Sequence, residues 1–178
     1  NPRTLLYSFI GGYQPGYLTN IRNEIFKLKT DDTICIQNTG DWHFNQLVYH
    51  PSQNNNLIEN TTDNHNKKTE TYNKILFSSR YSLCPSGSGP NSIRFWESLA
   101  CGSIPVLLAD TLELPFNPLW KDSIVTIPEK NIRDINTILG KIPVEKEKIM
   151  RKNCLDLYQY YKKCFSGISI HPPKRLFT

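Results

Sequence analysis

The stretch from 81 to 110 constrains this chain most, because it predicts a strand, a loop, a helix that ends at a glycine, and a second strand in direct succession. The loop is rich in small residues, Ser88 and Gly89 among them, which let the backbone turn tightly and leave its N–H groups open. The helix is predicted to begin near Asn91 or Ser92, both good N-cap residues. Such a helix start binds anions, because its free N–H groups and its dipole point at the ligand.

Two charged side chains stand on the predicted helix. At about 100° per residue, Arg94 and Glu97 fall on one face, and the large apolar residues fall mainly on the other. With the apolar face packed on a sheet, Arg94 would face a cleft and hold phosphate bidentately. Glu97, one turn deeper, would accept hydrogen bonds from ribose hydroxyls. A surface salt bridge between the two is the alternative, because opposite charges at i,i+3 are common.

Three short blocks in and after this stretch follow one another in a fixed order. They are Ser-x-Arg-x-x-Glu-x-Leu at 92–99, Gly-x-Ile-Pro-Val at 102–106 and Leu-Pro-Phe at 114–116. In these blocks the chain resembles the exostosin family, glycosyltransferase family 47, and the resemblance runs from about 72 to 125. It implies one half of a GT-B fold, namely the carboxyl-terminal Rossmann-like domain that binds a nucleotide sugar. It also implies a second, amino-terminal Rossmann-like domain as a partner.

The chemistry implied by the resemblance is an inverting transfer of a sugar from a nucleoside diphosphate sugar, with UDP the commonest carrier, to a glycan acceptor hydroxyl. No metal is required, because Arg94 and the helix start would stabilise the departing diphosphate. Asp110, at the carboxyl end of a buried strand, is a candidate catalytic carboxylate, with capping of a short helix as its alternative. Glu113, Asp41 and His43 are further candidates for the general base. The alternative function is a non-catalytic nucleotide-sugar-binding module that works only with a partner domain.

The amino-terminal part of the chain begins with a predicted strand at 4–10, which ends at Gly11 and Gly12. Ligands of open α/β sheets lie beyond the carboxyl ends of the strands, so both glycines are candidate backbone contacts to phosphate or sugar. A helix is predicted at 17–29. Arg22 in its first turns is expected to be exposed, with a reach to the phosphates as the alternative.

The remaining segments complete an alternation of strands and helices. Segment 46–68 is polar and is predicted to be a long mobile loop. The other predicted elements are a strand at 33–37, a short helix at 69–79, strands at 80–84, 106–109 and 124–127, and helices at 131–139 and 145–165. This alternation predicts an α/β fold, a single Rossmann-like domain over 1–178 with a mainly parallel sheet and flanking helices.

Composition excludes several other classes. The net charge of +5 comes without a long basic run, which argues against nucleic-acid binding, and no apolar segment is long enough for a membrane span. No Gly-x-Gly-x-x-Gly follows the first strand, which argues against a dinucleotide-dependent oxidoreductase. The five scattered cysteines lack metal-ligand spacing and predict reduced thiols, no metal site and a cytoplasmic protein. The Golgi lumen is the alternative if the chain is part of a longer, membrane-anchored protein.

Overall fold

A five-stranded parallel sheet forms the centre of the molecule, with strand order β2-β1-β3-β4-β5. The computed structural model describes residues 3–40 and 58–165. The strands are β1 (Leu5–Gly11), β2 (Ile34–Asn38), β3 (Ser79–Pro85), β4 (Ile104–Leu108) and β5 (Val125–Thr126). The predicted α/β fold with a parallel sheet is therefore confirmed.

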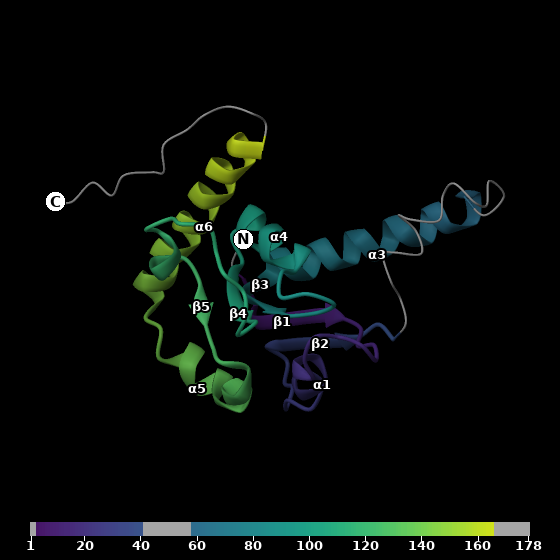
Figure 1. Ribbon diagram of the computed structural model, residues 1–178. Helices are drawn as coiled ribbons and strands as arrows, with labels where there is room; N and C mark the ends of the chain where they lie inside the picture. Colours follow the sequence, from purple (N-terminus) through teal and green to yellow (C-terminus); the bar gives the residue numbers. More distant parts are fainter. Residues whose placement is uncertain (1–2, 41–57, 166–178) are drawn as a thin grey trace.

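Helices cover both faces of this sheet. They are α1 (Ile21–Phe26), α3 (Ile58–Ser78), α4 (Ile93–Cys101), α5 (Ile135–Gly140) and α6 (Val144–Phe165), with 3-10 helices η1 (Trp120–Asp122) and η2 (Glu129–Asp134). Figure 1 shows α1 and α5 on one side of the sheet and α4 and α6 on the other. The crossover through α1 runs from β1 to β2, and the crossover through α4 runs the opposite way, from β3 to β4. The point between β1 and β3 is therefore a topological switch point, where ligands of such sheets bind.

The core lies between the sheet and its helices. All five residues of β4 are buried, as expected for a parallel strand covered on both faces. Helix α4 turns Phe95 and Leu99 inward, and both side chains are fully buried, as the predicted apolar face requires. Truncating a core residue of this kind to Ala costs about 2–5 kcal/mol. The helix is thus held firmly in one rotational setting, which fixes where its charged residues lie.

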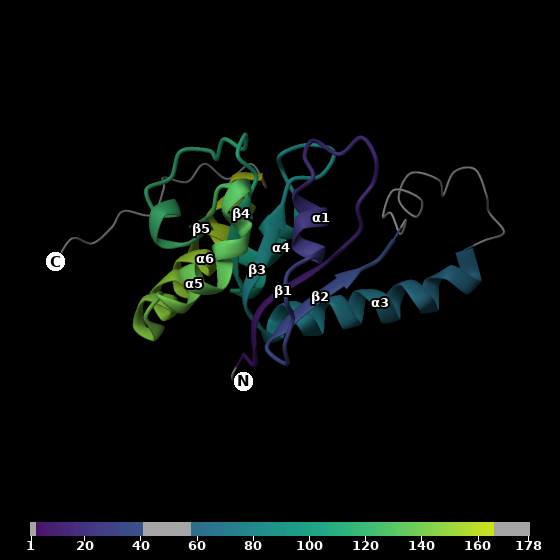
Figure 2. The ribbon, with the colours of Figure 1, turned by 90° about the horizontal axis from the view of Figure 1, so that it is seen from below.

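Helix α3 differs from the predicted structure of its segment. It begins at Ile58, so residues 58–68, predicted to be part of a mobile loop, are helical, and the predicted short helix at 69–79 is only the final part of α3. Residues 58–68 carry no apolar stripe, so periodicity gave no helix signal. Figures 1 and 2 show the helix projecting well beyond the sheet. The rest of the predicted loop, 46–57, lies outside the described residues.

The other helices lie where they were predicted in the sequence, but some differ from the predicted ranges in length. Helix α1 covers only 21–26 of the predicted 17–29. It begins late because the Leu18 N–H donates to the carbonyl oxygen of Gly87 at 2.8 Å and is thereby held against the loop after β3. The predicted helix at 131–139 is divided between η2 and α5, whereas the terminal helix is confirmed as α6. Within the described ranges, no helix is both long and apolar enough to cross a membrane.

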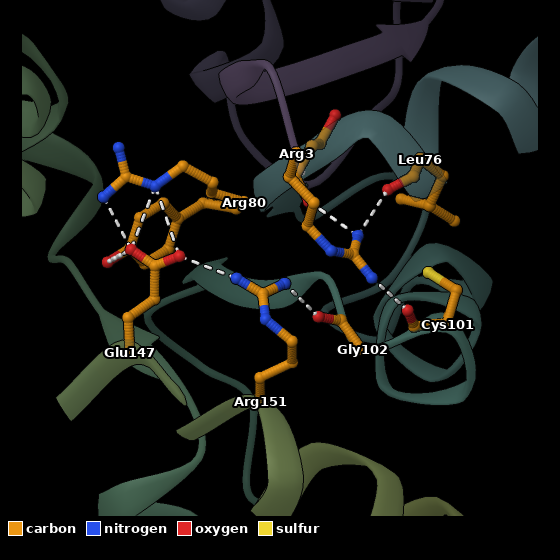
Figure 3. Close-up of polar contacts among 9 residues, drawn as sticks. Arg3, Leu76, Arg80, Cys101, Gly102, Glu147 and Arg151 are labelled. Atoms are coloured by element: carbon orange, nitrogen blue, oxygen red, sulfur yellow. Dashed lines mark hydrogen bonds and ion pairs between the residues drawn. The ribbon is translucent and has the colours of Figure 1, made fainter. Parts of the chain in front are cut away.

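A buried carboxylate ties α6 to the amino end of the sheet (Figure 3). Glu147 accepts hydrogen bonds from Arg80 of β3 and from Arg151, one helical turn further along α6, both at 2.6 Å. The hydroxyl of Tyr81 donates to the same carboxylate at 3.3 Å. Arg151 also donates to the carbonyl oxygen of Gly102, just before β4, at 2.7 Å. The carboxylate is therefore matched by two guanidinium groups.

Arg3, just before β1, also joins separate elements through hydrogen bonds. Its guanidinium group donates to the carbonyl oxygens of Leu76, Ser79 and Cys101 at 3.1, 2.8 and 2.5 Å (Figure 3). The carbonyls of Leu76 and Cys101 lie in the last turns of α3 and α4, where helices leave C=O groups without partners, and Ser79 begins β3. A single side chain therefore satisfies two helix ends.

Candidate functional site

The candidate site lies at the switch point, where the carboxyl ends of β1 and β3 meet. Gly11 ends the first strand and Gly12 follows it, and the loop that starts at Ser86 follows the second strand. The sequence predicted that these two segments would flank a ligand. The side chain of Arg22, which comes from α1, bridges them.

Arg22 joins the two strand ends through backbone carbonyls. Its Nε donates to the carbonyl oxygen of Ser86 at 2.9 Å, and its Nη1 donates to that of Gly12 at 3.0 Å. Its Cζ lies 4.8 Å from the ring centroid of Tyr17, within the range of a cation–π contact. The expectation that Arg22 is exposed is therefore wrong. The segment before α1 is hydrogen-bonded to the loop after β3 through Leu18 and Gly87, which places Arg22 beside that loop.

Arg94 lies deeper than predicted. Only 9% of its surface is exposed, and its Nη2 donates to the carbonyl oxygen of Ile10 near the end of β1. Its Cζ lies 4.7 Å from the ring centroid of Phe9. Its Nε is buried and has no hydrogen-bond partner. The side chain thus lies against β1 rather than in an open cleft, and it retains an unused donor.

The charges of Arg22 and Arg94 are not neutralised within the described residues, where neither side chain forms an ion pair. Burial, reinforced by the positive charge of Arg94, lowers the pKa of Arg22 to about 10. Two guanidinium groups without a carboxylate are costly to bring together, and a bound anion would remove that cost. The arrangement is therefore suited to phosphate, which arginine binds through several donors.

Two glycines make room for these guanidinium groups. A Cβ atom on Gly11 would lie 3.3 Å from Nη2 of Arg94, closer than most such contacts. A Cβ atom on Gly87 would lie 2.8 Å from Nη2 of Arg22, which would force that group to move. The lack of side chains at these positions lets both arginines approach the strand ends.

Gly12 has a packing role that the sequence did not predict. A Cβ atom there would overlap the carbonyl oxygen of Gly40, just beyond β2. Nearby, the Thr39 N–H donates to the carbonyl oxygen of Gly11 at 3.0 Å. Gly12 thus lets the chain after β2 approach the end of β1. The backbone contacts of Gly11 and Gly12 to a ligand stay a prediction.

The start of α4 has the predicted form. Ser92 occupies the N-cap position with extended backbone, and its side chain forms no capping hydrogen bond to the helix. Ser88 and Asn91 are exposed, and Gly89 has nothing within 4 Å of a Cβ placed on it. The first N–H groups of α4 are therefore not occupied by a side-chain cap. Ligand contacts at these four residues stay predictions.

Glu97 does not pair with Arg94, so the alternative of a surface salt bridge between them is wrong for the described structure. Its Oε2 instead accepts a hydrogen bond of 2.6 Å from the hydroxyl of Tyr72 on α3. Burial raises the pKa of the Tyr72 phenol above its ordinary value, opposed by the charge of Arg94 and reinforced by that of Glu97. Tyr72, which the sequence did not single out as a site residue, therefore remains a hydrogen-bond donor.

Of the four candidates for the catalytic carboxylate or base, the structure describes Asp110 and Glu113. Asp110 is exposed, and its Oδ1 accepts a hydrogen bond of 3.0 Å from the backbone N–H of Glu129 at the start of η2, which fits the capping alternative. Glu113 is exposed in the loop after β4. Asp41 and His43 lie outside the described residues. None of these observations decides the catalytic role.

A hydroxyl–carboxylate network beside Arg22 was not predicted. The hydroxyl oxygens of Thr19 and Ser86 are 2.9 Å apart, and Ser86 Oγ donates to Oε1 of Glu129 at 3.1 Å. These residues come from three segments far apart in the chain. Only the fold brings them together, so no local sequence signal could have found them.

Comparison with known proteins gives one consistent result. The sequence profile of the Exostosin GT47 domain matches residues 1–142. Exostosin-1 homolog of Caenorhabditis elegans is 27% identical over 180 residues, which cover 99% of this chain and 46% of the relative. Probable beta-1,4-xylosyltransferase IRX10 of Arabidopsis thaliana is 36% identical over 110 residues, 61% of this chain and 25% of the relative. Exostosin-1 of Drosophila melanogaster is 28% identical over 153 residues, 84% of this chain and 19% of the relative. The chain thus spans less than half the length of these relatives.

Proposed function

Because this chain belongs to the exostosin GT47 family, we propose that it forms the nucleotide-sugar-binding half of a glycosyltransferase. The observation that carries the proposal is the pair of arginines without carboxylate partners at the switch point of the sheet. Its relatives include a protein named as a xylosyltransferase and others named as glucuronosyltransferases, which supports sugar transfer as the reaction class.

The diphosphate of the donor would lie between Arg22 and Arg94, in front of the first turn of α4. Arg94 has a buried, unpartnered Nε to offer, and the start of α4 lacks a side-chain cap. A hydrogen bond to a charged group contributes about 1.5–3 kcal/mol, so each arginine should account for roughly a tenfold to hundredfold gain in affinity. Glu97, one turn further along α4, would accept hydrogen bonds from the ribose. The proposed carrier is UDP, as the family resemblance implies.

In the proposed reaction the acceptor hydroxyl of a glycan attacks the anomeric carbon from the face opposite the diphosphate. The bond from the anomeric carbon to the diphosphate oxygen breaks, its electron pair stays on that oxygen, and the configuration inverts. Arg22, Arg94 and the start of α4 would stabilise the negative charge that develops there. A general base takes the proton of the hydroxyl, and we propose Asp110 as the catalytic carboxylate within this chain.

A second Rossmann-like domain, amino-terminal to this one, would hold the acceptor. The described residues form one parallel sheet, and the chain spans 46% of the worm relative, which leaves room for such a domain in a longer protein. The same observation favours the second candidate function, a donor-binding module that does not transfer sugar until its partner domain is present. A transfer assay with and without that domain separates the two.

Calorimetric titration of UDP and of inorganic pyrophosphate tests the donor site. Arg94→Met keeps a long apolar stem on Phe9 and removes the charge, so both ligands should bind about tenfold to hundredfold more weakly. Glu97→Gln should weaken the binding of UDP and leave that of pyrophosphate unchanged, because pyrophosphate has no ribose. Lys152→Met removes a positive charge from an exposed position on α6, where Lys152 pairs with Asp156, and should leave both affinities unchanged. Equal affinities in wild type and Arg94→Met, with a lower melting temperature, would make Arg94 a structural residue.

A further inference from the structure

We propose that Tyr72 is a positioning residue that orients Glu97 towards the ribose of the donor; this inference rests on the function proposed above. Tyr72 lies near the carboxyl end of α3, and its hydroxyl donates to Oε2 of Glu97 on α4 at 2.6 Å. The hydrogen bond joins two helices that are separate in sequence. Through it, α3 contributes to the donor site without touching the ligand.

The contact leaves Glu97 half free for a ligand. Oε1 of Glu97 accepts no hydrogen bond within the part of the chain that the structure describes, whereas Oε2 is held by the phenol. A glutamate side chain has several rotatable bonds, and fixing one oxygen removes most of their freedom before the ligand arrives. The free oxygen is then presented in one orientation, which favours binding because less order has to be imposed.

The same tyrosine also lies beside the phosphate side of the site. The Cζ atom of Arg94 is 5.9 Å from the ring centroid of Tyr72. Tyr72 is therefore placed where the proposed ribose and diphosphate positions adjoin. Burial raises the pKa of its phenol, the charge of Arg94 lowers it and that of Glu97 raises it, and the net shift is upward, so the hydroxyl keeps its proton at neutral pH. It acts as a fixed donor and not as an acid or base.

Tyr72→Phe removes only the hydroxyl, and its effects on UDP and on pyrophosphate test the inference. We expect UDP to bind about threefold to tenfold more weakly, the range expected for one lost hydrogen bond, and pyrophosphate to bind as in the wild type. In a Glu97→Ala background, Tyr72→Phe should add no further loss, because the side chain that Tyr72 orients is absent. In the longer enzyme the KM for the nucleotide sugar should rise while kcat changes little.

Tyr81→Phe is the matched control. Tyr81 also donates its hydroxyl to a glutamate, at 3.3 Å to Oε2 of Glu147, but at the amino end of the sheet. Its loss should lower the melting temperature and leave both affinities unchanged. If Tyr72→Phe binds UDP as the wild type does, while Glu97→Gln binds it more weakly, the role of Tyr72 is overturned. The proposed function stands in that case. An equal loss for UDP and pyrophosphate would make Tyr72 a merely structural residue, and a wild type that binds neither ligand would overturn both proposals.

Discussion

Arg22 and Arg94 hold their guanidinium groups near one aromatic ring, with Cζ atoms 5.8 and 4.7 Å from the ring centroid of Phe9. The first arginine comes from α1 and the second from α4, on opposite faces of the sheet. The ring offsets part of the repulsion between them, because its face is negative. Neither guanidinium group forms an ion pair within the described residues, so both can still pair with an anion.

Arg22→Gln should weaken the binding of pyrophosphate and of UDP about equally, by roughly tenfold or more, because it removes one of the two charges of the proposed diphosphate site. It also relieves the repulsion with Arg94, so the melting temperature should change little despite the two lost hydrogen bonds. Calorimetry at two salt concentrations checks this, and the affinity of the variant should depend less on salt. Wild-type affinity in the variant would show that Arg22 only joins the strand ends.

Gly87→Ala should displace the guanidinium group of Arg22, since the new Cβ would lie 2.8 Å from Nη2. The end of a flexible side chain yields easily, so we expect a small loss of stability and a roughly threefold to tenfold loss of affinity for pyrophosphate, the share of one hydrogen bond. Gly140→Ala, at the end of α5, meets nothing within 4 Å and serves as the control. A variant at Gly87 with unchanged affinity would contradict the need for this close approach.

Asp110→Asn separates the two roles of Asp110. An amide oxygen can still accept the hydrogen bond from the N–H of Glu129, so the free energy of unfolding should change by less than about 0.5 kcal/mol. Without the carboxylate, single-turnover transfer by the longer enzyme should slow about a hundredfold, while UDP affinity stays at its wild-type value. A wild-type transfer rate would leave Asp110 as the residue that caps η2 and nothing more.

Glu147→Gln should destabilise the fold by about 3 kcal/mol, because Arg80 and Arg151 lose their shared counter-charge in a largely buried place. Glu145→Gln, two residues earlier on α6, is the control. Glu145 is 80% exposed and pairs with Lys148 at 2.8 Å, so its loss should cost less than about 1 kcal/mol. Urea denaturation measures both, and similar losses for the two variants would contradict a special role for Glu147.

The cysteines should differ sharply in their reaction with iodoacetamide. Burial raises the pKa of both Cys84 and Cys154 to about 12, so at pH 8 only about one thiol in ten thousand is the reactive thiolate. Cys164 is exposed at the end of α6. Mass spectrometry should find Cys164 labelled first and the two buried thiols labelled only after unfolding. Labelling of Cys84 or Cys154 at the rate of Cys164 in the folded protein would contradict this order.

The local sequence pattern was enough to predict the elements that have a strong hydrophobic periodicity. The apolar runs of β3 and β4, the loop before α4 and the stripe of α6 predicted their own structures, and with them the parallel sheet. Arg22 was misjudged because its position depends on a hydrogen bond between Leu18 and Gly87, which no local pattern reveals. The same holds for Tyr72, whose partner Glu97 is 25 residues away. The sequence left open the contacts between elements and the extent of the helices without strong periodicity, above all α3.

The hydrogen bonds at the amino ends of the strands, opposite the candidate site, bear on how such a domain can vary in sequence. Arg3, Arg80, Glu147 and Arg151 hold the amino ends of the strands, while the loops around the donor site leave the carboxyl ends. Under the proposed function, substitutions in those loops change which sugar is bound and leave intact the contacts that hold the amino ends of the strands.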